Sequence, residues 1–270
     1  MRLGIGSYTY TWAIGVPGHK PKRSMTAERL LEEAVRLKVK VVQFCDNLPL
    51  DRLGNRELSV CATFARKHDI QIELGTRGTG PAQLRRFLAL ASRFDCNFLR
   101  VVVQDRNGGF NQQRIMRDLV EVLPDFKAAG IKLALENYDG ASLPELVRLV
   151  GKLGTNHAGI CLDTVNSLAY AGGWRAVVNL LAPYALNLHA KDFTFSRMPS
   201  QMGFVVEGCA VGAGTLDVPW LLERLRSHRR DVNVIVELWT PRCGSLAKTL
   251  ALERSLAEAS VAYLRKHIPL

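Results

Sequence analysis

Four side chains that can bind a metal ion stand near the ends of short apolar runs in the second half of the sequence. They are Glu136 in "IKLALEN" (131–137), Asp163 in "HAGICLD" (157–163), His189 in "YALNLHA" (184–190) and Glu237 in "VNVIVEL" (232–238). One acidic residue at such a position is often only a helix cap or a salt-bridge partner. Several in succession favour a metal site, because carboxylates brought together repel one another unless a cation lies between them.

This set of donor atoms predicts one divalent cation. Carboxylate oxygens combined with a single imidazole suit Mn²⁺, Mg²⁺ or Co²⁺, and Zn²⁺ is a further alternative. We therefore expect Glu136, Asp163, His189 and Glu237 to bind one ion, with Mn²⁺ as the first choice.

Other polar side chains follow the apolar runs and are candidates for contact with a substrate. Lys191 lies two residues after His189, so its side chain is expected to point in the same direction, and we predict a catalytic role for it. We predict substrate contacts for Tyr8, Asp46, Arg77, Asn137 and Asn166. Ordinary packing is the alternative for Tyr8, and simple surface exposure is the alternative for Arg77.

These residues can meet only if parallel strands bring them to one edge. Four more apolar runs, at 3–8, 39–45, 70–75 and 97–103, precede the four above. Nearly continuous β-branched runs of this kind are typical of strands covered on both faces. Amphipathic helices are predicted over 26–38, 111–130, 216–228 and 246–267, with Thr26 as an N-cap and Gly130 as a C-terminal glycine. Pro124 is expected to kink or split the second of them.

Strict alternation of strands and helices over 270 residues predicts an α/β fold, a single-domain (β/α)₈ TIM barrel over residues 1–270. A doubly wound open sheet is the alternative. Against it, "GIGSYTYT" after the first run is not a GxGxxG nucleotide fingerprint.

Charge and hydropathy narrow the class of protein. The net charge of +11 would suit a nucleic acid or an anionic substrate, but Lys and Arg are spread over many segments, so we favour a solvated basic surface. The sequence has no run of about 18 apolar residues. Its start, "MRLGIGSYTYTW", lacks the apolar core of a signal peptide. We expect a cytoplasmic protein with neither a nucleic-acid nor a membrane partner.

The segment 193–214 is long for a connection that follows a strand. Within it, "MGFVVEG" (202–208) predicts a small hairpin. We interpret the segment as a lid or specificity loop from which Glu207 could reach the site, with a disordered excursion as the alternative.

The segments "ALENYDG", "GICLDTVNS", "NLHAKDF" and "VIVELW", together with "VGAGTLD", resemble the xylose isomerase-like TIM barrel superfamily of sugar isomerases and epimerases. The resemblance covers essentially the whole chain. It implies that Glu136, Asp163, His189 and Glu237 bind one Mn²⁺-like ion, and that Glu136 and Glu237 move a proton on opposite faces of a sugar. It also implies a small-molecule carbohydrate substrate and, by analogy, a homo-oligomer.

Two positions depart from the ketose 3-epimerases of that superfamily. Asn166 stands where they have a histidine, and Phe195 stands where they have an arginine. A plain ketose 3-epimerase is therefore disfavoured. Endonuclease IV is disfavoured as well, because its three-zinc site needs several histidines at strand ends.

The identity of the bond that breaks decides the reaction. If a C–H bond breaks next to a carbonyl, a glutamate takes the proton and the enzyme is an isomerase or epimerase acting through a metal-stabilised enediolate, which is our first expectation. If the C–COO⁻ bond of a 3-oxo acid breaks, the enzyme is a decarboxylase. A keto-sugar dehydratase is a third variant, and a non-catalytic sugar-binding barrel is the alternative from another class.

The decarboxylase alternative rests on a narrower resemblance. "GIGSYTYTWAIGVPG", "QFCDNLPL" and "IELGTRG" resemble bacterial 3-oxo-isoapionate decarboxylases within the superfamily. This resemblance would give Lys191 and Arg77 the task of holding a substrate carboxylate through charge-assisted hydrogen bonds.

Overall fold

Parallel strands that all end at the same edge form the centre of the molecule. The computed structural model describes residues 1–105 and 107–269. Eight strands close into a barrel in the order β1-β10-β7-β6-β5-β4-β3-β2, and every neighbouring pair is parallel. Their bounds are β1 Leu3–Gly6, β2 Val41–Phe44, β3 Gln71–Arg77, β4 Phe98–Val102, β5 Lys132–Glu136, β6 Ala158–Asp163, β7 Ala185–Ala190 and β10 Asn233–Val236. The predicted TIM barrel is confirmed, and the closed barrel rules out the open sheet.

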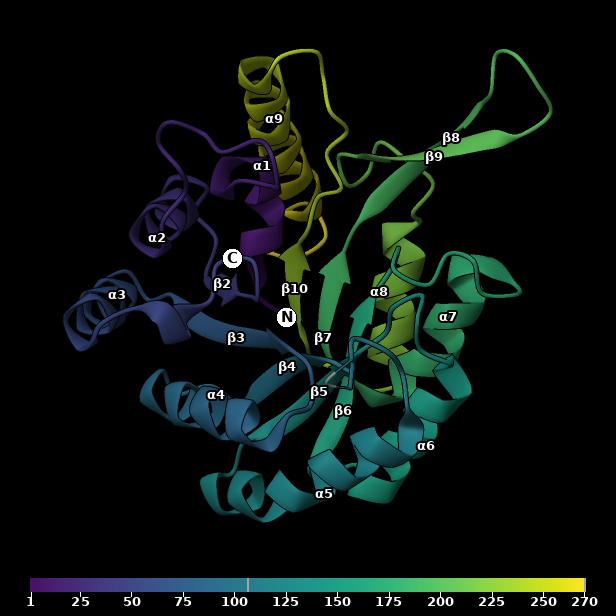
Figure 1. Cartoon of the computed structure of the whole chain (residues 1–270). Coiled ribbons are helices and arrows are strands. Elements are labelled where there is room, and N and C mark those ends of the chain that lie inside the picture. Colours follow the sequence, from purple (N-terminus) through teal and green to yellow (C-terminus); the bar gives the residue numbers. More distant parts are fainter. Residues whose placement is uncertain (106, 270) are drawn as a thin grey trace.

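Helices surround the barrel (Figure 1). Their bounds are α1 Thr11–Ile14, α2 Ala27–Arg36, α3 Asn55–Lys67, α4 Pro81–Arg93, α5 Gln112–Ala129, α6 Leu143–Leu153, α7 Gly173–Leu181, α8 Val218–Ser227 and α9 Leu246–Leu264. The hydroxyl of Thr26 accepts the Arg29 N–H at the start of α2, and Gly130 ends α5 in the left-handed conformation, as predicted. α5 continues through Pro124 as one helix, so the predicted split is wrong and the predicted kink stays a prediction.

The apolar core lies between the strands and the helices. Strand residues such as Ile5, Leu74 and Leu99 pack there against helix residues such as Leu30 and Leu84. Polar side chains are buried as well, and several of them point into the barrel, which makes its interior a place for charged and hydrogen-bonded groups. Within residues 1–105 and 107–269, no helix is long and apolar enough to cross a lipid bilayer.

An antiparallel ribbon follows β7 and extends beyond the barrel (Figure 1). It consists of β8 (Asp192–Arg197) and β9 (Phe204–Cys209), paired from Asp192 with Cys209 to Arg197 with Phe204. A hairpin is therefore present in this segment, but residues 202–208 supply only the end of its turn and most of its second strand, whereas the sequence predicted the whole hairpin there. The buried Asp192 anchors its base, because its carboxylate accepts the backbone N–H groups of Gly212, Gly214 and Leu216. Glu207 is exposed on the ribbon, and the lid function stays a prediction.

Candidate metal centre

Four side chains from consecutive strands converge at the carboxyl ends of the barrel strands. Glu136 and Asp163 are the last residues of β5 and β6, and His189 is the residue before the end of β7. Glu237 directly follows β10, which ends at Val236, and its backbone N–H donates to the Ala190 carbonyl. Each of the four side chains is at most 1% exposed.

The ring of His189 is the centre of this group. Its Nδ1 atom lies 3.3 Å from Glu237 Oε1, 3.6 Å from Asp163 Oδ2 and 3.7 Å from Glu136 Oε1. Donor atoms of Asp163, His189 and Glu237 all lie within 4.8 Å of one another. The sequence-predicted ligands are therefore brought together in space.

The hydrogen bonding of these atoms fits a bound cation. Within the described part of the chain, Asp163 Oδ2, His189 Nδ1 and both carboxylate oxygens of Glu237 are buried without a hydrogen-bond partner. Buried polar atoms without partners are costly unless a metal or another ligand satisfies them. Three oxygens and one imidazole nitrogen facing one point suit a divalent ion such as Mn²⁺ or Mg²⁺.

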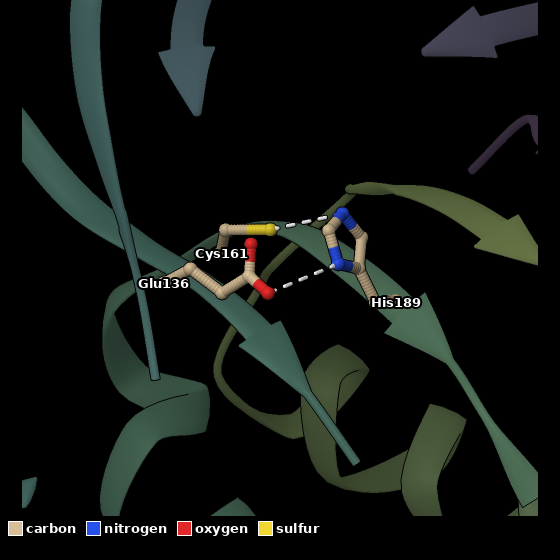
Figure 2. Close-up of side chains that lie close together, drawn as sticks. All are labelled: Glu136, Cys161 and His189. Carbon is tan, nitrogen blue, oxygen red and sulfur yellow. Dashed lines mark hydrogen bonds and ion pairs between the residues drawn. The ribbon is translucent and has the colours of Figure 1, made fainter. Parts of the chain in front are cut away.

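Cys161 lies on the other side of the imidazole. Figure 2 shows the thiol against one ring nitrogen of His189 and the Glu136 carboxylate against the other. The Sγ atom is 3.2 Å from Nε2, whereas the carboxylates face Nδ1. Although Glu136, Cys161 and His189 form a second cluster of potential ligands, the two nitrogens point in opposite directions. Cys161 therefore cannot share with the carboxylates an ion that is bound to Nδ1.

Lys191 reaches the same group of carboxylates. Its Nζ atom forms ion pairs with Asp163 Oδ2 at 2.8 Å and with Glu237 Oε2 at 2.9 Å. The same ammonium group donates a hydrogen bond to Asn166 Oδ1. Although burial lowers the pKa of Lys191, the two carboxylates raise it above its usual value. One ammonium against two carboxylates leaves a net negative charge for a cation to balance.

A buried arginine forms the opposite wall of the site. The Nε atom of Arg100, in the middle of β4, donates to Glu136 Oε2, and the Asn166 side chain donates to Glu136 Oε1. Burial raises the pKa of Glu136, but the positive charges of Arg100 and His189 outweigh this effect and lower the pKa to about 2. Gly75 on β3 makes room for this arginine, since a Cβ there would lie 2.8 Å from Arg100 Cδ.

Asp46 links the predicted substrate-binding residues. Its Oδ2 atom accepts hydrogen bonds from the Tyr8 hydroxyl at 3.0 Å and from Arg77 Nε at 2.9 Å, and its Oδ1 atom accepts one from Arg100 Nη1 at 2.9 Å. Burial raises the pKa of Asp46, but these two guanidinium groups outweigh it and lower the pKa. Because Asp46 accepts from all three, it fixes the positions of a phenol and two cations at the edge of the site.

Asn137 and Asn166 have different partners. Both ends of the Asn137 side-chain amide form hydrogen bonds with the backbone of Asp163. The Asp163 N–H donates to Asn137 Oδ1, and the Asp163 carbonyl accepts from Asn137 Nδ2. Asn137 therefore holds the end of β6 in place, and its contact with a substrate stays a prediction. Asn166 lies between Glu136 and Lys191 and borders the open space above the metal centre.

Two cavities that share lining residues open above the metal centre. One, of ≈ 440 Å³, is lined by Tyr8, Arg77, Arg100, Glu136, Asn166, Lys191 and Glu237, among others. The other, of ≈ 840 Å³, shares Tyr8, Asn166 and Lys191 and has a more apolar wall that includes Trp12, Phe195, Leu238 and Trp239. The first is large enough for a small polar molecule.

Sequence reasoning missed Arg100 and Gln43. Both lie inside apolar runs, "NFLRVVV" and "VKVVQFC", which were interpreted only as strands. A charged residue in the middle of a strand covered on both faces was the available signal, because such a residue must be paired inside the barrel. Glu73, within the run 70–75, is also buried in the barrel, where its carboxylate accepts a hydrogen bond from Gln43.

Comparisons with known proteins agree with this architecture. A protein-family model described as "Xylose isomerase-like TIM barrel" matches residues 31–267. A 3-oxo-isoapionate decarboxylase from Pectobacterium atrosepticum is 32% identical over 269 residues, which span 100% of this chain and 97% of the relative.

Two solved structures show the same fold at low sequence identity. A D-psicose 3-epimerase with D-fructose has a TM-score of 0.72 and 14% identity, covering 98% of this chain and 99% of the other. A Mycobacterium smegmatis protein in complex with magnesium has a TM-score of 0.70 and 13% identity, covering 97% of both chains. At this level of identity, the likeness concerns the fold alone.

Proposed function

The chain belongs to the xylose isomerase-like TIM barrel family, and we propose that it is a divalent-metal-dependent lyase that decarboxylates a 3-oxo sugar acid. The curated relative, identical at 32% of positions over the full chain, is a 3-oxo-isoapionate decarboxylase, and that compound is the first substrate to test. The isomerase expected first from the sequence becomes the second candidate.

Glu136, Asp163, His189 and Glu237 would hold the metal ion, since an oxygen of each carboxylate lies 3.3–3.7 Å from His189 Nδ1. Asp163 Oδ2, His189 Nδ1 and Glu237 Oε1 have no hydrogen-bond partner among the described residues. A divalent cation there would supply positive charge next to a substrate oxygen that becomes negative during the reaction. The four ligands are each at most 1% exposed, and the low local dielectric of a buried site would strengthen that interaction.

The pairing of Arg100 with Glu136 is the observation that favours a lyase over an epimerase. An epimerase that works with two glutamates needs each of them to accept a proton and release it again. Both oxygens of Glu136 are occupied by Arg100 and Asn166. Glu237, in contrast, has no hydrogen-bond partner among the described residues, and its Oε2 atom is in an ion pair with Lys191. Decarboxylation needs no second base, because the departing group leaves its electron pair behind.

The residues at the cavity have distinct tasks in this reaction. Arg77, exposed at the end of β3, binds the carboxylate that will leave. The C–COO⁻ bond breaks, its electron pair moves toward the neighbouring ketone, and CO₂ departs. One proton must then reach the carbon that lost CO₂, and Lys191, whose ammonium lines the same cavity, donates it. Glu237 orients Lys191 through their ion pair.

The isomerase remains the second candidate because the same metal ligands are present and Glu237 Oε1, which has no hydrogen-bond partner among the described residues, could act as a base. It would require Glu136 to leave Arg100, or a one-base reaction in which Glu237 both removes and returns the proton.

The experiment incubates the Mn²⁺-loaded protein with 3-oxo-isoapionate and, separately, with neutral ketoses in D₂O. The lyase predicts CO₂ release from the acid that depends on added metal. Deuterium incorporation into a ketose without CO₂ release from the acid would instead establish the isomerase. If the loaded protein does neither, the proposed reaction is wrong.

A further inference from the structure

We propose that Gln43 is a positioning residue for the metal centre: held by Glu73, it fixes the His189 ring with Nε2 protonated and Nδ1 free to bind the cation. The inference rests on the proposed function only in that it requires a metal at Nδ1, and it concerns residues deep in the barrel that do not touch the substrate.

The contact between Gln43 and His189 is short and buried. Gln43 Oε1 lies 2.7 Å from His189 Nε2, and neither side chain is exposed to solvent. An amide oxygen can only accept a hydrogen bond, so the ring must carry its proton on Nε2 if this contact is a hydrogen bond. The Cys45 thiol also donates to Gln43 Oε1, which supports its assignment as the acceptor end.

Glu73 decides which end of the Gln43 amide faces His189. Gln43 Nε2 donates to Glu73 Oε2 at 3.1 Å and to Asn187 Oδ1 at 3.1 Å. A reversed amide would place its oxygen against these two acceptors and lose both hydrogen bonds in a buried place, where unsatisfied groups are costly.

Asn187 and Asn233 hold Glu73 in turn. The Asn187 side chain donates to Glu73 Oε2 at 3.0 Å, and the Asn233 side chain donates to Glu73 Oε1 at 2.7 Å. The chain of contacts therefore runs from β10 and β7 through β3 and β2 to the ring on β7. Partners of this kind, on the far side of a histidine ligand, select its tautomer and orientation.

The consequence is a ring whose unprotonated nitrogen faces three carboxylate oxygens. In this position Nδ1 can accept only a proton or a metal ion. The barrel interior thus prepares His189 for the cation before the cation arrives, and removal of the Gln43 oxygen should weaken metal binding without removing any ligand.

The first test needs no substitution. In the Zn²⁺-loaded, diamagnetic protein with ¹⁵N-labelled histidine, long-range proton–nitrogen spectra report which ring nitrogen carries the proton, and the His189 signal is the one missing from His189→Gln. We expect the proton on Nε2 and the metal on Nδ1. A proton on Nδ1 would overturn the proposal.

The second test measures the affinity for Mn²⁺ by calorimetry. Gln43→Leu should raise the dissociation constant about 10–100-fold, the usual effect of losing a partner behind a metal ligand. The double variant Gln43→Glu with Glu73→Gln exchanges acid and amide, keeps an acceptor at His189, and should bind within a few-fold of the wild type. Thr249→Val, which removes a buried hydroxyl from α9 far from the barrel interior, is the control and should bind like the wild type.

The outcomes separate the two proposals. If the wild type binds no divalent cation, the proposed metal-dependent function fails. If the wild type binds Mn²⁺ and Gln43→Leu binds it equally well, only the role of Gln43 fails. A Gln43→Leu protein that does not fold leaves the wild-type spectrum to decide the question.

Discussion

Glu237 and Glu136 are the same residue type in the same site, yet their surroundings give them different chemistry. Glu136 is tied to a guanidinium and an amide, whereas both oxygens of Glu237 lack a hydrogen-bond partner among the described residues. Glu136, whose oxygens already have partners, can serve as a metal ligand and a fixed negative charge. Glu237 can in addition contact the substrate or orient its neighbour Lys191.

Glu237→Gln should therefore reduce turnover strongly. We expect kcat to fall about 10²–10⁴-fold, because the variant loses the negative charge of a metal ligand and the carboxylate that orients Lys191. The measurement is steady-state CO₂ release at saturating Mn²⁺. Glu223→Gln on the exposed face of α8 is the matched control and should keep full activity. Turnover of Glu237→Gln near the wild-type rate would remove Glu237 from the reaction.

Arg77→Leu should weaken substrate binding more than it slows the reaction. A hydrogen bond between charged groups contributes about 1.5–3 kcal/mol, so KM should rise about 10–100-fold with a smaller change in kcat. Arg86→Leu serves as the control, since Arg86 pairs with Asp51 away from the cavity. An unchanged KM in Arg77→Leu would show that another group binds the carboxylate.

At the scale of elements, Glu253 connects the last helix to the short helix beside the cavity. Its carboxylate on α9 accepts the backbone N–H groups of Trp12 and Ala13 at the start of α1. Burial raises the pKa of Glu253 to about 7, although these two hydrogen bonds lower it. The carboxyl group therefore holds a proton in the folded chain at pH values where the unfolded chain has lost it.

The sign of the pH dependence follows from this difference. The stabilising contribution of Glu253 is complete below its unfolded pKa, 4.5, and is lost as the pH rises through about 7. Glu253→Gln cannot ionise, so its free energy of unfolding relative to the wild type should rise by about 3 kcal/mol between pH 4.5 and pH 8. Urea unfolding of both proteins at the two pH values measures the difference. An equal difference at both values would contradict this account.

The β8–β9 ribbon rests on the barrel through a glycine. A Cβ on Gly208 would lie 2.0 Å from the Trp239 carbonyl oxygen, so Gly208→Ala must displace backbone. We expect a loss of about 1–3 kcal/mol in the free energy of unfolding, measured by urea denaturation. Gly151→Ala, inside α6 with open space around it, is the paired control and should be neutral or stabilising. Equal stabilities of the two variants would contradict the close contact.

At the scale of the whole molecule, the sequence predicted the barrel and the convergence of Glu136, Asp163, His189 and Glu237. Both follow from one rule, that parallel strands in a closed barrel end at the same edge. Arg100, Gln43 and the orientation of Glu73 could not be placed in the same way. Their partners are distant in sequence, as Gln43 and His189 are, and which strand residues point into the barrel depends on the register between strands.

The most direct test of the account is the position of a bound ion. An anomalous difference map from crystals grown with Mn²⁺ should show one strong peak at each barrel, within bonding distance of His189 Nδ1, Asp163 Oδ2 and the carboxylates of Glu136 and Glu237. A map without a peak between these four side chains, or with the ion bound elsewhere, would contradict the central claim.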